Sequence, residues 1–213
     1  MINILIADDH TIVRKGLIEL VEDSKSIQVS AEAKNSAEVM QLLVSQSFDL
    51  VVLDISMPGR SGLEALKDIK KMYPKIPVLI LSMYPEEQYA VRVIKAGASG
   101  YLNKDSAPEE LIKAIKTIAK GRKYISMAIA EQLADHFDQS FEKPLHEQLS
   151  DREYEVMLKI SNGVSLTTIA NELSLSVKTI STYKCRIQKK LNLKTSNEIT
   201  HYVISNNLNL TYL

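Results

Sequence analysis

Residues 49–59 read DLVVLDISMPG. The unbroken apolar run Leu50–Leu53 is typical of a strand that is buried on both faces of a sheet. The run meets Asp54, and the pair Pro58-Gly59 interrupts regular structure soon afterwards. An aspartate in this place is commonly a turn or helix-capping residue. Whether Asp54 has a chemical role therefore depends on what stands at the ends of the other strands.

Similar apolar runs alternate with amphipathic stretches over residues 1–120. The runs expected to be strands are Ile2–Ala7, Ile27–Ala31, Leu50–Leu53, Pro77–Leu81 and Ser99–Leu102. The stretches with helical periodicity are residues 12–21, 36–46, 63–72, 86–96 and 106–120, the last opened by a capping box from Ser106 to Glu109. This alternation predicts an α/β doubly wound five-stranded parallel sheet with right-handed crossovers.

Polar side chains follow four of these strands. Asp8 and Asp9 come after the first strand, Asp54 after the third, Ser82 after the fourth and Lys104 after the fifth. In a doubly wound sheet, ligands bind beyond the carboxyl ends of the strands. Each residue alone has a structural explanation, but the five together are hard to explain by capping. We expect them to meet at one edge of the sheet.

This set of side chains suits phosphoryl chemistry. Three carboxylates held together repel one another unless a cation balances them, and oxygen donors suit a hard divalent ion, above all Mg²⁺. One carboxylate would remain free to attack a phosphoryl donor. Lys104 and Ser82 would then bind phosphoryl oxygens. His10 is more commonly a polar residue at a helix start than a metal ligand.

The motifs at this edge resemble a bacterial response-regulator receiver domain, which has a flavodoxin-like fold. The resemblance rests on DDH at 8–10, D-x-x-M-P-G from Asp54, LS at 81–82, GASGYLNKD at 97–105 and the S-x-P-E-E-L that follows. It implies that Asp54 is the phospho-acceptor, and that Asp8, Asp9, Asp54 and the backbone carbonyl of Ser56 arrange Mg²⁺. Ser82 and Tyr101 would be the switch pair, although a strand aromatic that simply packs on a helix is the plainer reading of Tyr101. Many receivers have proline after the lysine, whereas this chain has Asp105, which leaves the geometry of the Lys104–Asp105 bond open.

The second half of the chain has a different pattern. Residues 121–147 predict a helical segment, 127–137, and a polar linker that contains Pro144. Residues 148–213 predict a small all-α domain that begins with a capping box, Ser150 to Glu153. Its helices are expected at residues 151–161, 166–173, 177–191 and 196–206, and the second and third match a helix-turn-helix.

The expected recognition helix is strongly basic. Between Ser176 and Lys194 the chain has six basic residues and no acidic residue. Lys178, Ser181, Thr182 and Cys185 are predicted to approach bases, and Thr179, Lys184, Lys189 and Lys190 are predicted to approach phosphates. An inward stripe of Val177, Ile180, Ile187 and Leu191 would face the domain core. A run of charge on a helix is often only a solvated face, but this run follows a tight turn and has one sign.

The segment from Leu149 to Leu193 resembles the LuxR-type helix-turn-helix. The match rests on RE at 152–153, IA at 169–170, LS at 175–176, TI at 179–180 and KKLN at 189–192. Tyr183 stands where this family commonly has histidine, which affects base preference rather than DNA binding. With the receiver, the chain looks like a two-component response regulator of the NarL/FixJ type.

The resemblance implies a phosphorylation-dependent transcriptional regulator rather than an enzyme. Its partners would be a histidine kinase, double-stranded DNA and a second copy of the chain when phosphorylated or DNA-bound, with Ile199, Val203 and Ile204 as candidate dimer contacts. An aspartyl-phosphate phosphatase is disfavoured because Ser56 replaces the second carboxylate of D-x-D. A phosphorylation-independent regulator with the same fold, or an adaptor whose helix-turn-helix binds protein, remains an alternative.

Composition sets outer bounds on these hypotheses. The 213 residues are 45% hydrophobic and the formal net charge is zero, so the whole chain is neither a polybasic arm nor an acidic tail. One cysteine, Cys185, excludes an intrachain disulfide framework, and a small groove-lining thiol is a commoner role for it than a redox sensor. No run approaches the ~18 apolar residues of a membrane span, and no signal-peptide pattern is present. We therefore expect a cytoplasmic protein.

Overall fold

The structure is a computed structural model that describes residues 1–57, 61–127, 129–131, 133, 144–206 and 208. The chain divides into two compact units, Met1–His136 and Phe137–Leu213, here called the N-terminal and C-terminal units. Most of the helix expected at 127–137 and of the polar linker lies outside the described residues. Each unit is considered by itself.

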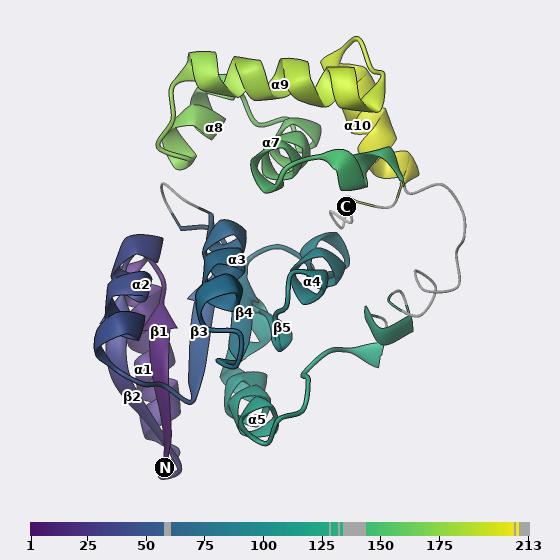
Figure 1. Cartoon of the computed structure of the whole chain (residues 1–213). Helices are drawn as coiled ribbons and strands as arrows, with labels where there is room; N and C mark the ends of the chain where they lie inside the picture. Colours follow the sequence, from purple (N-terminus) through teal and green to yellow (C-terminus); the bar gives the residue numbers. More distant parts are fainter. Residues whose placement is uncertain (58–60, 128, 132, 134–143, 207, 209–213) are drawn as a thin grey trace. The chain divides into compact units, whose positions relative to one another are not determined.

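The N-terminal unit contains a five-stranded parallel sheet in the order β2-β1-β3-β4-β5 (Figure 1). The strands are β1 (Ile2–Ala7), β2 (Ile27–Ala33), β3 (Leu50–Asp54), β4 (Val78–Ser82) and β5 (Gly100–Asn103). The helices are α1 (Thr11–Glu22), α2 (Ser36–Ser45), α3 (Gly62–Met72), α4 (Glu86–Lys95) and α5 (Ala107–Ala119). The predicted α/β doubly wound sheet is thus confirmed, with strand ends that differ by one or two residues.

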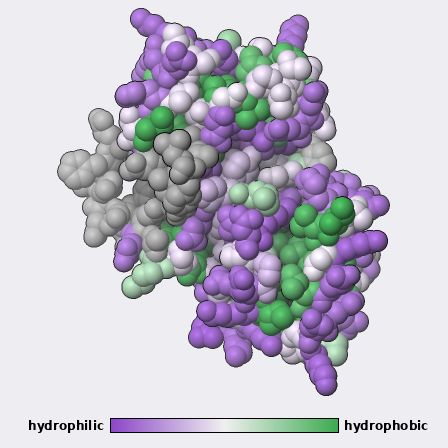
Figure 2. Space-filling view, turned by 180° about the vertical axis from the view of Figure 1, so that it is seen from behind, coloured by the Kyte–Doolittle hydropathy of each residue, from purple (hydrophilic) through white to green (hydrophobic). Residues whose placement is uncertain are grey.

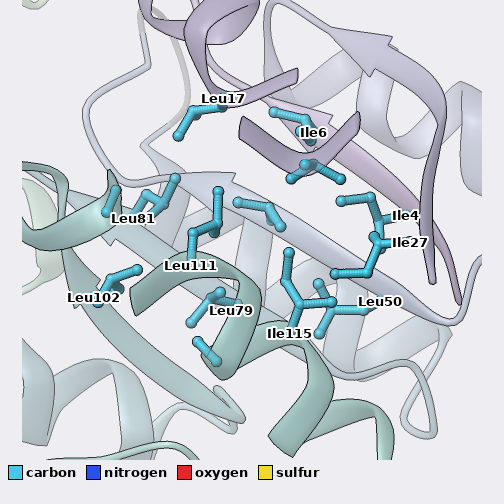
Figure 3. Packing of buried hydrophobic residues seen from close by; sticks show 14 of the residues in the cluster. Ile4, Ile6, Leu17, Ile27, Leu50, Leu79, Leu81, Leu102, Leu111 and Ile115 are labelled. Atoms are coloured by element: carbon cyan, nitrogen blue, oxygen red, sulfur yellow. The ribbon is translucent and has the colours of Figure 1, made fainter. Parts of the chain in front are cut away.

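A hydrophobic core lies between the sheet and helices α1 and α5 (Figure 3). Side chains of alternate strand residues, such as Ile4 and Ile6 of β1, pack there against Leu17 of α1 and Leu111 and Ile115 of α5. All five residues of β3 are buried, as the sequence run predicted for a strand covered on both faces. No described residue of α2, α3 or α4 belongs to this core, as expected if right-handed crossovers place these helices over the opposite face of the sheet.

Side-chain caps fix where several helices begin. Asn35 caps α2, and Ser61 forms a capping box with Glu64 at the start of α3. The capping box expected from Ser106 is absent, because Ser106 has helical backbone angles and makes no side-chain cap hydrogen bond. A short 3₁₀ helix, η1 (Lys104–Ser106), precedes α5 instead, and the side chain of Asn103 caps it.

The chain after α5 returns to the sheet. Tyr124 forms a parallel bridge with Gly100 of β5, and its backbone N–H donates to the carbonyl of Ser99 over 2.9 Å. A Cβ on Gly100 would lie 2.8 Å from the carbonyl oxygen of Tyr124, so a glycine is needed for this approach. The first residues beyond 120 therefore pack with the N-terminal unit rather than leaving it at once.

The C-terminal unit is helical in its described residues. It contains the 3₁₀ helix η2 (Leu145–Gln148) and helices α7 (Asp151–Ser161), α8 (Leu166–Glu172), α9 (Val177–Leu191) and α10 (Ser196–Ser205). Ser150 and Glu153 form the predicted capping box at the start of α7. Ser174, with φ of 55°, lies in the turn between α8 and α9, and Ser176 caps α9. The expected pair of helices joined by a tight turn is present.

Two expectations for side-chain facing were wrong in part. Ile180, Ile187 and Leu191 are buried in α9 as predicted, but Val177 remains 43% exposed because it is the first residue of the helix. Ile199 and Val203 of α10 are completely buried, and only Ile204 is exposed. Of the three candidate dimer contacts on α10, only Ile204 is therefore available on the surface.

Exposed apolar side chains are spread over several elements. Ile12 of α1, Val44 of α2 and Met72 of α3 are each more than half exposed. Figure 2 shows hydrophobic residues in separate groups among hydrophilic ones on the face that it presents. Such scattered apolar residues are normal on a protein surface. None of the described helices combines the length and the apolar character that a membrane span requires.

Candidate phosphoryl-accepting site and DNA interface

Strand register brings the acidic residues together. Ala7 of β1 pairs with Leu53 of β3, so the residues that follow them, Asp8 and Asp54, lie beside each other. Leu81 pairs with Asp54. In the same way Ser82 of β4 pairs with Asn103 of β5, which places Lys104 directly beyond that pair. The sheet edge that the sequence predicted is therefore present in the structure.

Lys104 joins the two buried carboxylates. Its ammonium Nζ lies 2.7 Å from Oδ2 of Asp8 and 2.8 Å from Oδ2 of Asp54. Asp8 and Asp54 are each only 1% exposed, so these charges have lost most of their water. The backbone N–H of Ser56 donates to Oδ1 of Asp54 over 3.1 Å. The Asp54 carboxylate is thus held from both oxygens.

Burial and charge oppose each other at this site. Burial raises the pKa of Asp54, and the positive charge of Lys104 acts in the opposite direction without cancelling the increase. Burial by itself would lower the pKa of Lys104, but the carboxylates of Asp54 and Asp8 raise it above its usual value. Lys104 therefore stays protonated, and the excess negative charge of the cluster favours an additional cation.

The cluster has the donors for a metal ion. One ligand atom each from Asp8, Asp9, His10 and Asp54 lies within 4.8 Å of the others. Oδ1 of Asp9 and Oδ2 of Asp54 are buried, and each has one nitrogen atom close by, Nδ1 of His10 and Nζ of Lys104 respectively. Buried carboxylate oxygens gathered in this way fit a hard divalent cation. His10 stands at the N-cap of α1, as expected, with Nδ1 3.0 Å from Oδ1 of Asp9.

The predicted switch residues contact the loop between β4 and α4. Ser82 is completely buried, and its Oγ accepts a hydrogen bond from the backbone N–H of Tyr84 over 3.0 Å. Tyr101 is 2% exposed, and its hydroxyl donates to the backbone carbonyl of Tyr84 over 2.6 Å. Burial raises the pKa of the Tyr101 hydroxyl, so it remains a neutral donor. Both side chains therefore reach the same peptide segment.

Three supporting residues carry little signal in the sequence. Buried Arg14 on the inner stripe of α1 donates through Nη1 to the backbone carbonyl of Asp8 over 2.7 Å, and its Nε binds Glu32. Gly62 allows α3 to begin against the backbone of Asp54, where a Cβ would meet the carbonyl oxygen at 2.1 Å. Asn103 bonds both to the turn after Lys104 and to Tyr84. The sequence offered two clues to these supports: Gly62 at the start of an expected helix, and Arg14 on the apolar stripe of another.

Helix α9 exposes four of the nine predicted DNA-contacting side chains and buries none of them completely. Lys178, Thr182, Cys185 and Lys189 are exposed, and Thr179, Ser181, Tyr183, Lys184 and Lys190 are half-buried. The hydroxyl of Thr179 is within 2.8 Å of the Ser176 hydroxyl at the N-cap, and Thr182 donates to the carbonyl of Lys178. The exposed set lies on the side of α9 away from the buried Ile180, Ile187 and Leu191.

Lys190 has an internal partner that the sequence did not reveal. Its Nζ lies 2.6 Å from Oε2 of Glu153 in the α7 capping box and 3.1 Å from the carbonyl of Gln148. Burial by itself would raise the pKa of Glu153, but hydrogen bonds from Lys190 and Ser150 lower it below its usual value. The ammonium that we predicted at a phosphate is thus also part of the packing of α9 on α7.

An acidic, lysine-bearing edge of a doubly wound sheet, carried on one chain with a helix-turn-helix, defines a signal-receiving transcription regulator. Residues 4–116 match the model of the response regulator receiver domain, and residues 147–203 match that of the bacterial regulatory proteins of the luxR family. The chain therefore belongs to the two-component response regulators of the NarL/FixJ type.

Individual relatives cover almost the whole chain. Response regulator UvrY of Escherichia coli (strain K12) is 36% identical over 209 residues, which are 98% of this chain and 96% of that protein. Response regulator GacA of Pseudomonas aeruginosa is 35% identical over 203 residues, 93% of this chain and 94% of that protein. RcsB of Salmonella enterica serovar Typhimurium, solved on promoter rprA with the phosphomimetic BeF3-, is 27% identical with a TM-score of 0.64, covering 96% of this chain and all of that one.

Proposed function

We propose that Asp54 accepts a phosphoryl group and that the modification controls DNA binding by α9. A carboxylate oxygen of Asp54 attacks the phosphorus of a phosphohistidine on the partner kinase. The P–O bond forms as the P–N bond breaks, and the imidazole leaves with the electron pair and is protonated. The product is an acyl phosphate on Asp54. The chain thus acts as a regulator and not as an enzyme with a separate substrate.

The observation that carries this proposal is the buried Asp54 carboxylate in contact with Lys104. The ammonium 2.8 Å from Oδ2 is placed to neutralise a phosphoryl oxygen once the acyl phosphate forms. Buried Ser82 offers a hydroxyl on the neighbouring strand, whose hydrogen bond could be exchanged from Tyr84 N–H to the phosphoryl group. Tyr101, on the next strand, would respond through its bond to the Tyr84 carbonyl, because the N–H of the same residue is bonded to Ser82.

Mg²⁺ is the cation that we assign to the acidic cluster. Asp8, Asp9, Asp54 and the backbone carbonyl of Ser56 would hold it, in keeping with its preference for oxygen ligands. Such an ion neutralises charge on the transferring phosphoryl group. The close grouping of buried carboxylate oxygens from Asp8, Asp9 and Asp54 supports the assignment.

The output is sequence-selective binding to double-stranded DNA in the bacterial cytoplasm. We take residues 1–120 as the receiver, 121–147 as a helical segment and linker, and 148–213 as the DNA-binding domain. Lys178, Ser181, Thr182 and Cys185 would contact bases, and Thr179, Lys184, Lys189 and Lys190 would contact phosphates. Tyr183 would be a further DNA-contacting residue that affects base preference. RcsB has been solved as two dimers bound to two DNAs, which supports a homodimer as the DNA-bound form here.

Labelling with a small phosphodonor tests the acceptor. Asp54→Asn should abolish Mg²⁺-dependent incorporation from radiolabelled acetyl phosphate. The matched control is Asp49→Asn, which alters the carboxylate at the opposite end of β3, bonded to the N–H of Asn3. Wild-type labelling in the Asp54→Asn variant would remove Asp54 as the acceptor. DNA binding that is equally tight with and without acetyl phosphate would favour the phosphorylation-independent alternative.

A further inference from the structure

Asn103 is the last residue of β5 and directly precedes Lys104. Its side chain makes hydrogen bonds in two directions. Oδ1 accepts from the backbone N–H of Asp105 over 2.8 Å and so caps the 3₁₀ turn that contains the lysine. Nδ2 donates to the backbone carbonyl of Tyr84 over 3.3 Å. One amide therefore connects the turn after β5 with the loop after β4.

The loop end of this connection is the segment that contacts both switch residues. The carbonyl of Tyr84 accepts from the Tyr101 hydroxyl as well as from Asn103. The N–H of Tyr84 donates to Oγ of Ser82. A displacement of this segment would alter the position of the Ser82 hydroxyl and of the Tyr101 ring together, since each is bonded to it.

The turn end of the connection contains the phosphoryl-neutralising lysine. The backbone carbonyl of Asn103 accepts from the Ser106 hydroxyl over 3.1 Å, which adds a second bond across the turn. The N–H that donates to Oδ1 of Asn103 is present because residue 105 is not a proline, which has no backbone donor. In this chain the direction of the Lys104 peptide is therefore fixed by a side chain.

We propose that Asn103 is a positioning residue for phosphoryl transfer, which couples the Lys104 turn to the Ser82–Tyr84 loop. This rests on the proposed role of Asp54 as acceptor. Asn103 touches neither Asp54 nor the metal cluster in the hydrogen bonds described, so its effect passes through Lys104, Ser82 and Tyr101. Loss of the bond to Tyr84 should loosen the arrangement that receives the phosphoryl group, even when the turn itself stays capped.

Two substitutions separate the two ends of the connection. Asn103→Ser keeps an oxygen that can accept from the N–H of residue 105, as serine does in local turns, but it is too short to reach Tyr84. Asn103→Ala removes both bonds. The matched controls are Asn35→Ser and Asn35→Ala, because Asn35 also caps a turn with Oδ1, over 2.9 Å to Glu38 N–H, without bonding to the β4–α4 loop.

The rate of Asp54 labelling at a series of acetyl phosphate concentrations is the first measurement. We expect both Asn103 variants to lower the maximal rate constant about three- to tenfold, the factor that the net loss of one hydrogen bond corresponds to. The acetyl phosphate concentration that gives half of the maximal rate should change less than twofold. The second measurement is ¹⁹F NMR of 3-fluorotyrosine protein, in which the Tyr101 signal, assigned with Tyr101→Phe, should move in both variants and in neither Asn35 control.

The outcomes distinguish this inference from the proposed function. If Asn103→Ser labels as wild type and only Asn103→Ala is slow, the cap of the turn is what matters and the coupling is refuted. Wild-type rates and Tyr101 signals in both variants would also refute it, while loss of labelling in Asp54→Asn would still support the acceptor. If the wild-type chain itself takes no label, both proposals fail. Thermal melting of all variants shows whether a slow rate merely reflects unfolding.

Discussion

Gly62→Ala tests whether the approach of α3 sets the position of the acceptor backbone. A Cβ at this position would lie 2.1 Å from the carbonyl oxygen of Asp54 and 2.5 Å from Cα of Ile55. Both neighbours are backbone atoms, so neither can swing aside as a side chain would. Because real Cβ contacts essentially never fall below 3.0 Å, the first turn of α3 and the end of β3 must separate by about 0.9 Å.

The expected cost follows from the contacts that this separation disturbs. Overpacking costs about 1–3 kcal/mol, and strain on the 2.9 Å bond from Gly62 N–H to the carbonyl of Ile55 adds about 1 kcal/mol. The higher helix propensity of alanine returns about 1 kcal/mol. A net loss of about 2 kcal/mol should lower the melting temperature of the N-terminal unit by ~10 °C. Labelling of Asp54 should also slow, because the acceptor moves.

Gly16→Ala is the matched control. Gly16 lies within α1, and nothing stands within 4 Å of the position of its Cβ. Alanine there should stabilise the unit by up to about 1 kcal/mol through helix propensity and leave labelling unchanged. Urea unfolding followed by circular dichroism and acetyl phosphate labelling give both quantities. A Gly62→Ala protein as stable and as rapidly labelled as wild type would show that this close approach does not set the acceptor.

Three more measurements address other parts of the molecule. Asp9→Asn replaces one of the clustered carboxylates by a neutral amide, so Mg²⁺ binding measured by calorimetry should weaken at least ~10-fold, whereas unchanged binding would remove Asp9 from the ligand set. The pKa of Glu153 is below its usual value of 4.5 in the folded chain. The ionised side chain therefore contributes its full stabilisation above that pH and loses it as the pH falls through the lowered pKa. Glu153→Gln should flatten the fall in stability of the C-terminal unit at acid pH, and an unchanged fall would refute the pairing with Lys190. Lys189→Ala should reduce the slope of log K against log salt for DNA binding by about 1, and Lys190→Ala should reduce it less but lower stability, since Glu153 loses its partner.

The acidic edge could be predicted because it depends on where the parallel strands end and not on how individual side chains pack. An apolar run shows where a parallel strand ends, and parallel strands end at a common edge. Asp8, Asp54 and Lys104 had to meet once the alternation of strands and helices was recognised. The register of the strands places these residues side by side, and the conformations of their side chains then set the distances of 2.7 and 2.8 Å between them.

The supports of that edge could not be predicted in the same way. Asn103 has no periodic signal, and its two bonds depend on how two loops approach each other. The cap formed by Asn103 also explains why the capping box expected from Ser106 is absent. Asn103 caps the turn three residues earlier, so Ser106 is already inside helical backbone, where an N-cap cannot stand. Serine is a good N-cap residue in general, but at Ser106 this preference is overridden by the cap that Asn103 provides three residues earlier.

The number of basic residues in the sequence does not by itself predict how many of them are free to contact DNA phosphates. Ser176–Lys194 contains six basic residues, but Lys190 already neutralises Glu153. Of the other five, Lys194 interacts with Glu198, whereas Lys178, Lys184, Arg186 and Lys189 have no ion-pair partner among the residues that the structure describes. If all five met phosphates, the slope of log K against log salt would be about −4.5 per chain, and about −9 for a dimer on two half-sites. A steeper slope would indicate further phosphate contacts, and if Lys190 supplied one by leaving Glu153, DNA binding would destabilise the α7 capping box. The salt dependence of binding, compared between wild type and Lys190→Ala, thus tests whether α9 meets DNA in the packing that it has here.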